Sequence, residues 1–301
     1  MDIRAILMGV FFAVMWASAF TSTRMIVTEV PPLFALALRF ALSGVMAVVI
    51  ALLMGQTWRA LTRAQWRAVV ILGLCQNALY LGLNWVAMQW IEAGLASIIA
   101  ATMPLIVAPL GWVLMGERLR PMGVAGLVLG LAGVAIIMGA RLQGGGSDPV
   151  GIVMCFAAAL ALAVATLTVR GASSGGNVMM IVGLQMLVGS VTLWCIAPLL
   201  EDWHVDPNPR LVWAFLYTVI VPGLVATWVW FKLVGRIGAV RAATFHFLTP
   251  FFGVATGAAL LGEQLAMGDV IGVGVIMAGI LAVQLSKAPA PVVPVRPAPP
   301  A

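Results

Sequence analysis

Charged residues are scarce in this sequence. Only 9% of its 301 residues are Asp, Glu, Lys or Arg, whereas 63% are hydrophobic. The mean hydropathy is +1.11. Soluble domains typically carry about 25% charged residues, and one soluble core of this length could not hide so much apolar surface. The composition therefore excludes a soluble globular protein and predicts a membrane protein.

Cysteines and enzyme motifs are also scarce. Cys75, Cys155 and Cys195 form an odd set with no metal-ligand spacing, so we expect small buried hydrophobes and neither a disulfide framework nor a metal site. The sequence has no His-Glu-x-x-His helix, no paired Asp site and no Gly-x-Ser-x-Gly elbow. These absences argue against an intramembrane enzyme, and no cofactor is predicted.

Charged and Gly/Pro-rich interruptions divide the chain into apolar stretches, each about long enough for a membrane-spanning helix. There are ten: 3–24, 31–54, 66–90, 93–115, 120–140, 150–170, 177–199, 210–234, 239–262 and 267–286. The first stretch lacks a convincing cleavage site, so we expect a retained helix and not a removed signal peptide. The Pro/Ala-rich tail, 288–301, is predicted to be disordered.

The net charge is +6, and the basic residues are distributed unequally between the two sides of the membrane. With the N-terminus inside, twelve Lys and Arg residues fall on the inner side, and three, Arg24, Arg141 and Arg210, fall outside. This asymmetry predicts an N-in, C-in topology. Arg39 lies about two turns into the second stretch, and we expect it to snorkel outward. The excess of basic residues therefore sets the orientation of the protein in the lipid bilayer and argues against a nucleic-acid partner. We expect this bilayer to be a bacterial inner membrane.

Two apolar segments resemble each other. TMPLIVAPLGWVLMGERL (102–119) and LTPFFGVATGAALLGEQL (248–265) share a proline near the start and a Gly-Glu-x-Leu ending. A shift of the chain by 146 residues aligns Pro104 with Pro250 and, without a gap, also pairs Asp2 with Asp148. The sequence therefore contains an internal repeat.

The repeat unit covers five apolar stretches. We expect one copy at 1–142 and a second at 149–287, joined by the glycine-rich QGGGSDPVG. Because five is odd, the second copy enters the membrane from the opposite side. Inverted repeats are typical of secondary transporters, whose substrate site lies near the midplane between the halves.

These elements together resemble a known family. Ten spans in two inverted halves, each with a proline-bearing helix, a Gly-Glu-x-Leu turn and a glycine-rich last helix, are similar to the EamA-domain transporters of the drug/metabolite transporter superfamily over about residues 3–286. The MWASAF opening, the length and the Trp-rich spans are most similar to bacterial aromatic amino acid exporters. The resemblance implies an all-α membrane protein of ten transmembrane helices.

The recurring residues have a structural and a functional interpretation. Pro104 and Pro250 remove backbone donors and should kink their helices. Each kink would line the cavity, act as a hinge or only shape the helix. Pro222 marks a further predicted break. Glu117 and Glu263 should sit near the N-terminus of the next helix, where the helix dipole favours a carboxylate, and we prefer this structural role to proton coupling.

The substrate site should be a mostly apolar cavity with a few polar groups. Asn77, Tyr80 and Asn84 share one helical stripe, which either lines the site or only bonds neighbouring helices. The other candidates are polar or aromatic residues deep in the spans. They are Trp16, Thr21, Thr102, Met103, Thr227, Trp228 and His246.

Transport of a small-molecule substrate is the function we expect, with amino acids favoured over drugs or other metabolites. No Asp or Glu falls in the middle of a span; because ion-coupled transporters often keep such a group, facilitated movement and proton antiport both stay open. A non-transporting scaffold or sensor is the alternative. Glycine pairs such as Gly126/Gly130 favour packing within the fold over a dimer face, so we expect a monomer.

Overall fold

The described part of the protein is built from helices. The computed structural model describes residues 3–115, 121–144, 148–168, 177–205, 207–237, 245, 248–264 and 267–286, and it contains no strand within these ranges. The described regions cover most of both predicted repeats. Glu117, His246 and the tail 288–301 lie outside them.

The first repeat contains α1 to α7. The bounds are α1 Ile3–Val27, α2 Pro32–Leu53, the 3-10 turn η1 Trp58–Ala60, α3 Arg63–Ile71, the π-helix η2 Leu72–Leu81, α4 Gly82–Ala87, α5 Ala93–Ala101, α6 Met103–Met115 and α7 Pro121–Gly144. The described elements of the second repeat are α8 Pro149–Thr168, α9 Val178–Leu200, α10 Pro209–Thr218, the π-helix η3 Val219–Val225, α11 Ala226–Ile237, α13 Thr249–Leu261 and α14 Met267–Ser286.

Ten apolar helical segments overlap the ten predicted stretches. Five are long and apolar enough to cross a membrane: Ile3–Val27, Pro32–Leu53, Arg63–Ala87, Val178–Leu200 and Pro209–Trp230. Five more are shorter, Ala93–Val107, Pro121–Ile137, Pro149–Ala165, Thr249–Leu261 and Met267–Ala282. The described chain is therefore an all-helical protein with the composition of a membrane bundle.

The helices repeat with the same spacing as the sequence. α1, α2, α3, α6 and α7 begin at residues 3, 32, 63, 103 and 121, and α8, α9, α10, α13 and α14 begin 146 residues later, at 149, 178, 209, 249 and 267. The π-helices η2 and η3 also occupy equivalent positions. The local structure therefore follows the internal repeat, including its departures from the α-helix.

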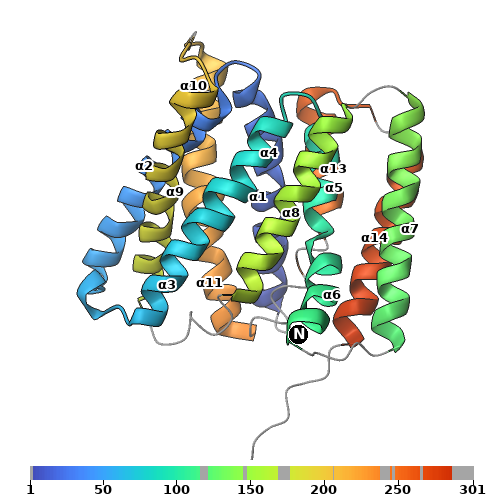
Figure 1. Cartoon of the computed structure of the whole chain (residues 1–301), viewed down its shortest axis with the longest axis horizontal. Helices are drawn as coiled ribbons and strands as arrows, with labels where there is room; N and C mark the ends of the chain where they lie inside the picture. Colours follow the sequence, from blue (N-terminus) through green and yellow to red (C-terminus); the bar gives the residue numbers. More distant parts are fainter. Residues whose placement is uncertain are drawn as a thin grey trace, which may run out of the picture.

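Equivalent helices pack against each other in opposite directions. At the start of α2, the Leu33 amide donates to the Glu201 carboxylate, which follows the end of α9, at 3.0 Å. Beyond the other end of α2, the Gln56 side chain accepts from the Met180 amide at the start of α9, also at 3.0 Å. α7 and α14 form a second such pair at one edge of the molecule (Figure 1).

The two prolines that recur in the repeat, Pro104 and Pro250, lie in the first turn of a helix, whereas we predicted a kink inside a helix. α5 ends at Ala101, and Pro104 is the second residue of α6. In the same way, Pro250 is the second residue of α13. A proline in the first turn of a helix loses no hydrogen bond, because the first amides have no partner inside the helix. Neither proline therefore removes a hydrogen bond from the interior of α6 or α13.

Glycines allow α7 and α14 to touch through their backbones. A Cβ at Gly279 would lie 2.7 Å from the carbonyl oxygen of Gly126 and would also overlap the backbone of Gly130. One at Gly133 would lie 2.8 Å from the amide nitrogen of Ile276. Small residues at such crossings let membrane helices approach closely. The glycine-rich last helix of each half therefore serves packing within the fold.

We predict that Gly279→Ala destabilises the protein by about 1–3 kcal/mol, as other overpacked sites do, because its Cβ meets backbone that cannot move aside. Gly274→Ala on the same helix is the control, since a Cβ there has no neighbour within 4 Å. Thermal unfolding of both purified variants in detergent measures the difference. Equal melting temperatures for the two would contradict this packing.

Candidate functional site

A small cavity lies between α1, α2, η2, α4 and η3. Its lining residues are Trp16, Ala19, Phe20, Thr23, Arg39, Tyr80, Leu81, Asn84, Trp85, Met88 and Pro222. The volume is about 50 Å³, enough for a few water molecules but below the roughly 300 Å³ of small-molecule pockets. The cavity is therefore smaller than a pocket that holds a small-molecule substrate.

Arg39 is the charged residue of this cavity, and its position corrects the sequence-based expectation. Its side chain is only 7% exposed and does not snorkel outward. The Nε group donates to the Thr218 carbonyl at 3.4 Å. The guanidinium carbon lies 5.4 Å from the centre of the Phe40 ring and 5.8 Å from that of Trp85. Aromatic faces thus hold the cation inside the bundle.

Pro222, inside the π-helix η3, helps to place Arg39. Proline has no N–H to donate to the carbonyl four residues earlier, which here belongs to Thr218. That carbonyl accepts from Arg39 instead. A Cβ at the next residue, Gly223, would lie 3.0 Å from the Ser43 hydroxyl, so the glycine lets α2 approach η3. The Pro-Gly pair therefore positions α2 and its arginine against the second repeat.

The structure brings three of the predicted substrate residues together at this cavity. Trp16, Tyr80 and Asn84 line it with Pro222. The Asn84 amide donates to the Tyr80 carbonyl at 2.8 Å, and its oxygen accepts from the Cys155 thiol at 3.4 Å. The Tyr80 hydroxyl has no hydrogen bond within the described residues. The site thus combines a cation, a phenol, an amide and an indole.

Other predicted residues lie away from this cavity. Asn77 donates to the Gln185 carbonyl on α9 at 2.9 Å, which is the interhelical alternative for that residue. Thr21 donates to Thr256 on α13 at 2.9 Å. The Trp228 side chain is 52% exposed and is stacked under the Lys232 ammonium.

The remaining candidates also do not line the cavity. Thr102 and Thr227 donate to carbonyls of their own chain segments, those of Ile99 and Gly223. Met103 is half-buried at the start of α6. His246 lies outside the described residues, as does Glu117.

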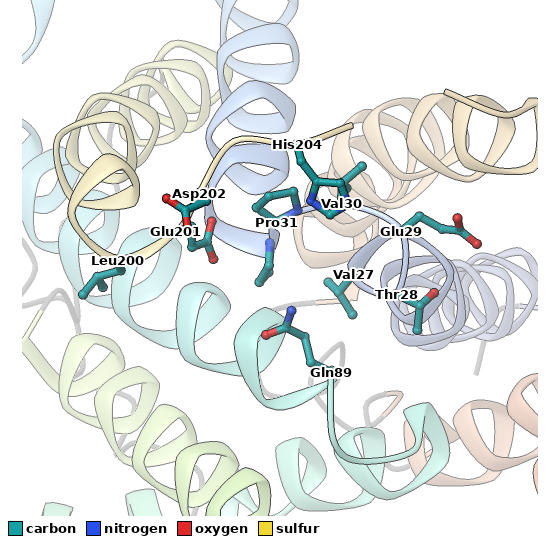
Figure 2. Close-up of a pocket in the computed structure, with 11 residues that line it drawn as sticks. Val27, Thr28, Glu29, Val30, Pro31, Gln89, Leu200, Glu201, Asp202 and His204 are labelled. Carbon is teal, nitrogen blue, oxygen red and sulfur yellow. The ribbon is translucent and has the colours of Figure 1, made fainter. Parts of the chain in front are cut away.

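A polar pocket of about 330 Å³ lies near the cavity, at the turn between α1 and α2. Glu29, Glu201, Asp202 and His204 line it, and the Gln89 side chain extends towards Pro31 from the turn after α4 (Figure 2). Met88, the neighbour of Gln89, lines the central cavity. Adjacent residues of the turn after α4 therefore line the pocket and the cavity.

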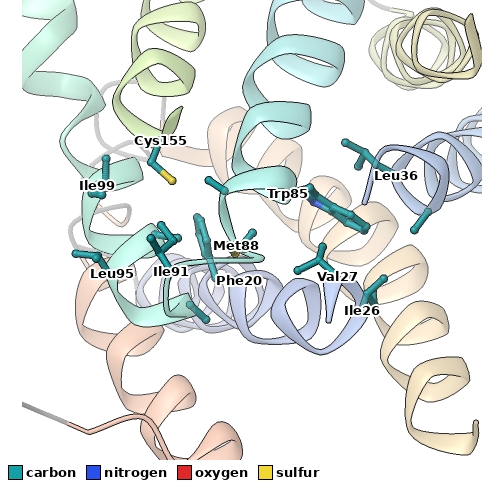
Figure 3. Packing of buried hydrophobic residues seen from close by; sticks show 14 of the residues in the cluster. Phe20, Ile26, Val27, Leu36, Trp85, Met88, Ile91, Leu95, Ile99 and Cys155 are labelled. Atoms are coloured by element: carbon teal, nitrogen blue, oxygen red, sulfur yellow. The ribbon is translucent and has the colours of Figure 1, made fainter. Parts of the chain in front are cut away.

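An apolar cluster fills this end of the bundle. Its buried members include Phe20, Ile26, Val27, Trp85 and Met88, and they come from α1, α4 and the turn that follows α4 (Figure 3). A guanidinium nitrogen of Arg24, in the last turn of α1, donates to the Met88 carbonyl. The cavity is therefore closed by packed side chains on the side that faces the polar pocket.

Two carboxylates cap helices of the opposite repeat at the same end. Glu263 accepts from the Ala93 and Gly94 amides at the start of α5, at 2.6 and 2.9 Å. Glu201 accepts from the Leu33 and Phe34 amides at the start of α2, at 3.0 and 3.2 Å. Each carboxylate satisfies amides that have no partner inside their helix.

The Glu263 cap corrects a detail of the prediction. We expected this carboxylate at the start of the next helix, α14, and it instead reaches α5. A Cβ at Gly257 would overlap the carboxylate, and one at Gly94 would lie 3.1 Å from it. The two glycines make room for this approach, which the sequence alone does not reveal because the capped helix is 170 residues away.

Comparison with known proteins identifies the family. The model of the EamA-like transporter family matches the chain twice, at residues 3–139 and 149–285. The chain belongs to the EamA-like transporter family. It is therefore a membrane transporter of small solutes with a two-repeat helical fold.

Individual relatives agree with this family. "Uncharacterized inner membrane transporter YedA" of Escherichia coli (strain K12) is 27% identical over 96% of this chain and 94% of its own length. "Uncharacterized transporter YvbV" of Bacillus subtilis (strain 168) is 26% identical over 92% and 90%. A solved crystal structure superposes with a TM-score of 0.65, at 23% identity, over 95% of this chain and 98% of the other, which shows the fold.

The stability of this transporter should depend on pH through Glu263. Burial raises the pKa of this carboxyl above its ordinary value of 4.5, against the opposing effects of the Gly94 and Ala93 amides. The folded protein therefore keeps a proton that the unfolded chain has lost. The resulting contribution to the free energy of unfolding is complete below pH 4.5 and disappears as the pH rises through the raised pKa.

Glu263→Gln cannot titrate, so its melting temperature should vary less steeply with pH than that of the wild type in the acidic range above pH 4.5. The slope should not vanish, because burial also raises the pKa of Glu201. Thermal unfolding at several pH values measures this slope. Asp202→Asn, at an exposed carboxylate, is the control, and identical slopes for Glu263→Gln and this control would refute the role of Glu263.

Proposed function

We propose that this transporter exports or facilitates amino acids, preferably aromatic or hydrophobic ones such as tryptophan, phenylalanine and methionine, across a bacterial inner membrane. Alternating access at the central cavity moves them. The observation that supports this proposal is the meeting of Trp16, Tyr80, Asn84 and Arg39 around one cavity. An indole and a phenol suit a flat apolar side chain, and the polar groups suit the charged end of an amino acid.

The small cavity fits a transporter with one end closed. At the end that holds the polar pocket, the apolar cluster, the Arg24 contact and the two carboxylate caps join the repeats. The antiparallel pairs α2/α9 and α7/α14 support inverted repeats that exchange conformations. We expect a single chain to be the transporting unit.

Export of drugs or other metabolites is the alternative within the same family. Such substrates would contact the same apolar side chains of the cavity and would not require its polar groups. A scaffold without transport would move no solute at all. Substrate uptake separates the three, and it also separates facilitated movement from proton antiport.

The direct test is uptake of labelled tryptophan, phenylalanine, methionine and threonine into proteoliposomes, with and without an imposed pH gradient. We expect uptake of the first three, and Trp16→Ala should raise the apparent KM for tryptophan by about two- to tenfold, the equivalent of the ~0.5–1.5 kcal/mol of an aromatic contact. Trp213→Ala is the control, because this tryptophan, in the middle of α10, is 73% exposed. Uptake no greater than in empty liposomes would exclude amino acid transport.

The proposed orientation places both termini inside and the polar pocket outside, in ten transmembrane segments. The distribution of Lys and Arg supports this orientation. The loop with His204 then faces the periplasm, and the turn with Arg59 faces the cytoplasm.

Single cysteines test this orientation in a variant whose Cys75, Cys155 and Cys195 are replaced by serine. We expect a membrane-impermeant maleimide to label His204→Cys on intact spheroplasts and to label Arg59→Cys only after the membrane is permeabilised. Both positions are at least partly exposed. The reverse pattern would invert the orientation, while labelling of both on intact spheroplasts would exclude the predicted odd number of segments between them.

A further inference from the structure

Arg39 is a buried charge without a carboxylate partner among the described residues. Its recorded interactions are one long hydrogen bond, to the Thr218 carbonyl at 3.4 Å, and two contacts with aromatic rings. A guanidinium carries five N–H donors in a planar fork. Four of these donors therefore have no hydrogen-bond acceptor within the described chain, although the side chain is only 7% exposed.

Such an arrangement is costly for the protein alone. A buried charge costs several kcal/mol unless it is paired and hydrogen-bonded, and charged residues inside membrane segments usually mark a functional site. The cavity next to Arg39 offers no internal anion, since no Asp or Glu lines it. The missing acceptor must come from elsewhere, and the cavity is the space into which it can enter.

We propose that Arg39 is the residue that binds the carboxylate of the transported solute, and that the site therefore selects carboxylic acids and zwitterions over amines with the same side chain. This inference rests on the proposed function for its amino acid substrates. The planar fork matches the two oxygens of a carboxylate. The Tyr80 hydroxyl, which also lines the cavity, supplies a further donor.

Recognition of the ammonium group is weaker in this site. The cavity offers it only neutral acceptors, such as the side chain of Asn84, while the positive charge of Arg39 repels an amine that lacks a carboxylate. Aromatic walls accept the apolar side chain in both cases. The carboxylate thus decides which solutes enter, and the rings decide which side chains fit.

Three compounds with one aromatic ring separate these contributions: phenylalanine, 3-phenylpropionate and 2-phenylethylamine. Their binding is measured as thermal stabilisation of the purified protein, which does not require transport. We expect phenylalanine and 3-phenylpropionate to stabilise the wild type at concentrations within about tenfold of each other. The amine should need at least about 100-fold more, because it loses charge-assisted hydrogen bonds and meets a like charge.

Variants of Arg39 test whether this side chain is responsible. Arg39→Gln should weaken binding of both carboxylic acids by about 10- to 100-fold and reduce the discrimination against the amine. Arg39→Lys should restore part of the affinity, because it keeps the charge without the fork. Arg210→Gln, at an exposed arginine at the start of α10, removes the same charge and should leave binding unchanged. The melting temperature without ligand reports any loss of folding.

The outcomes distinguish the inference from the proposed function. Binding of the amine as tightly as of the acids, or unchanged acid binding in Arg39→Gln, overturns the role of Arg39 even where phenylalanine is transported. Acid-selective binding that depends on Arg39, together with no uptake of any amino acid by proteoliposomes, refutes amino acid transport and leaves the carboxylate site intact, with other organic acids as its substrates.

Discussion

Backbone groups freed at helix breaks constrain this structure more than any other feature, because an apolar bundle offers them no water. Several such groups find their partners in the opposite repeat. Glu263 and Glu201 of the second repeat cap α5 and α2 of the first. In the other direction, Arg39 and Ser43 of the first repeat donate to the Thr218 and Val219 carbonyls of the second. The two halves are held together by completing each other's backbone hydrogen bonds.

This constraint links stability to movement. A conformational change that separates the repeats at the polar end must release the carboxylate caps and the apolar cluster together. Capping bonds of this type contribute about 0.5–2 kcal/mol each, which is small enough for a bound solute to offset. The extensive glycine contacts between α7 and α14 lie at the edge of the molecule, and they can hold the repeats together while the centre rearranges.

The sequence was informative where structure depends on local patterns. Apolar runs located the helices, and the internal repeat gave helix starts that recur after 146 residues in the structure. Local rules also explain why proline could be placed near a break but not assigned to a kink or a helix start: both remove the same donor. The structure decides between the two for Pro104: α5 ends at Ala101 and α6 begins at Met103, so this proline lies at a helix start.

The site was less predictable because its key contacts join distant parts of the chain. Arg39 read alone suggests a snorkelling side chain. In the structure it contacts the Thr218 carbonyl, which precedes the π-helix η3 and lies about 180 residues later in the chain. The stripe of Asn77, Tyr80 and Asn84 was recognisable, yet a π-helix changes the angular spacing of residues, and η2 covers the first two. Asn77 accordingly contacts α9 while Tyr80 and Asn84 reach the cavity.

The charge of the cavity would also affect the energetics of the proposed export. A zwitterion moves no net charge, so its flux follows its concentration gradient. A carboxylate without an ammonium carries one negative charge, and an inside-negative potential favours its exit by about 2.3 kcal/mol per 100 mV. A site with a fixed cation and no lining carboxylate can release such an anion outward without a coupling ion. At the proposed carboxylate site, the membrane potential would therefore act on the charge of the solute itself, since the lining of the cavity holds no Asp or Glu.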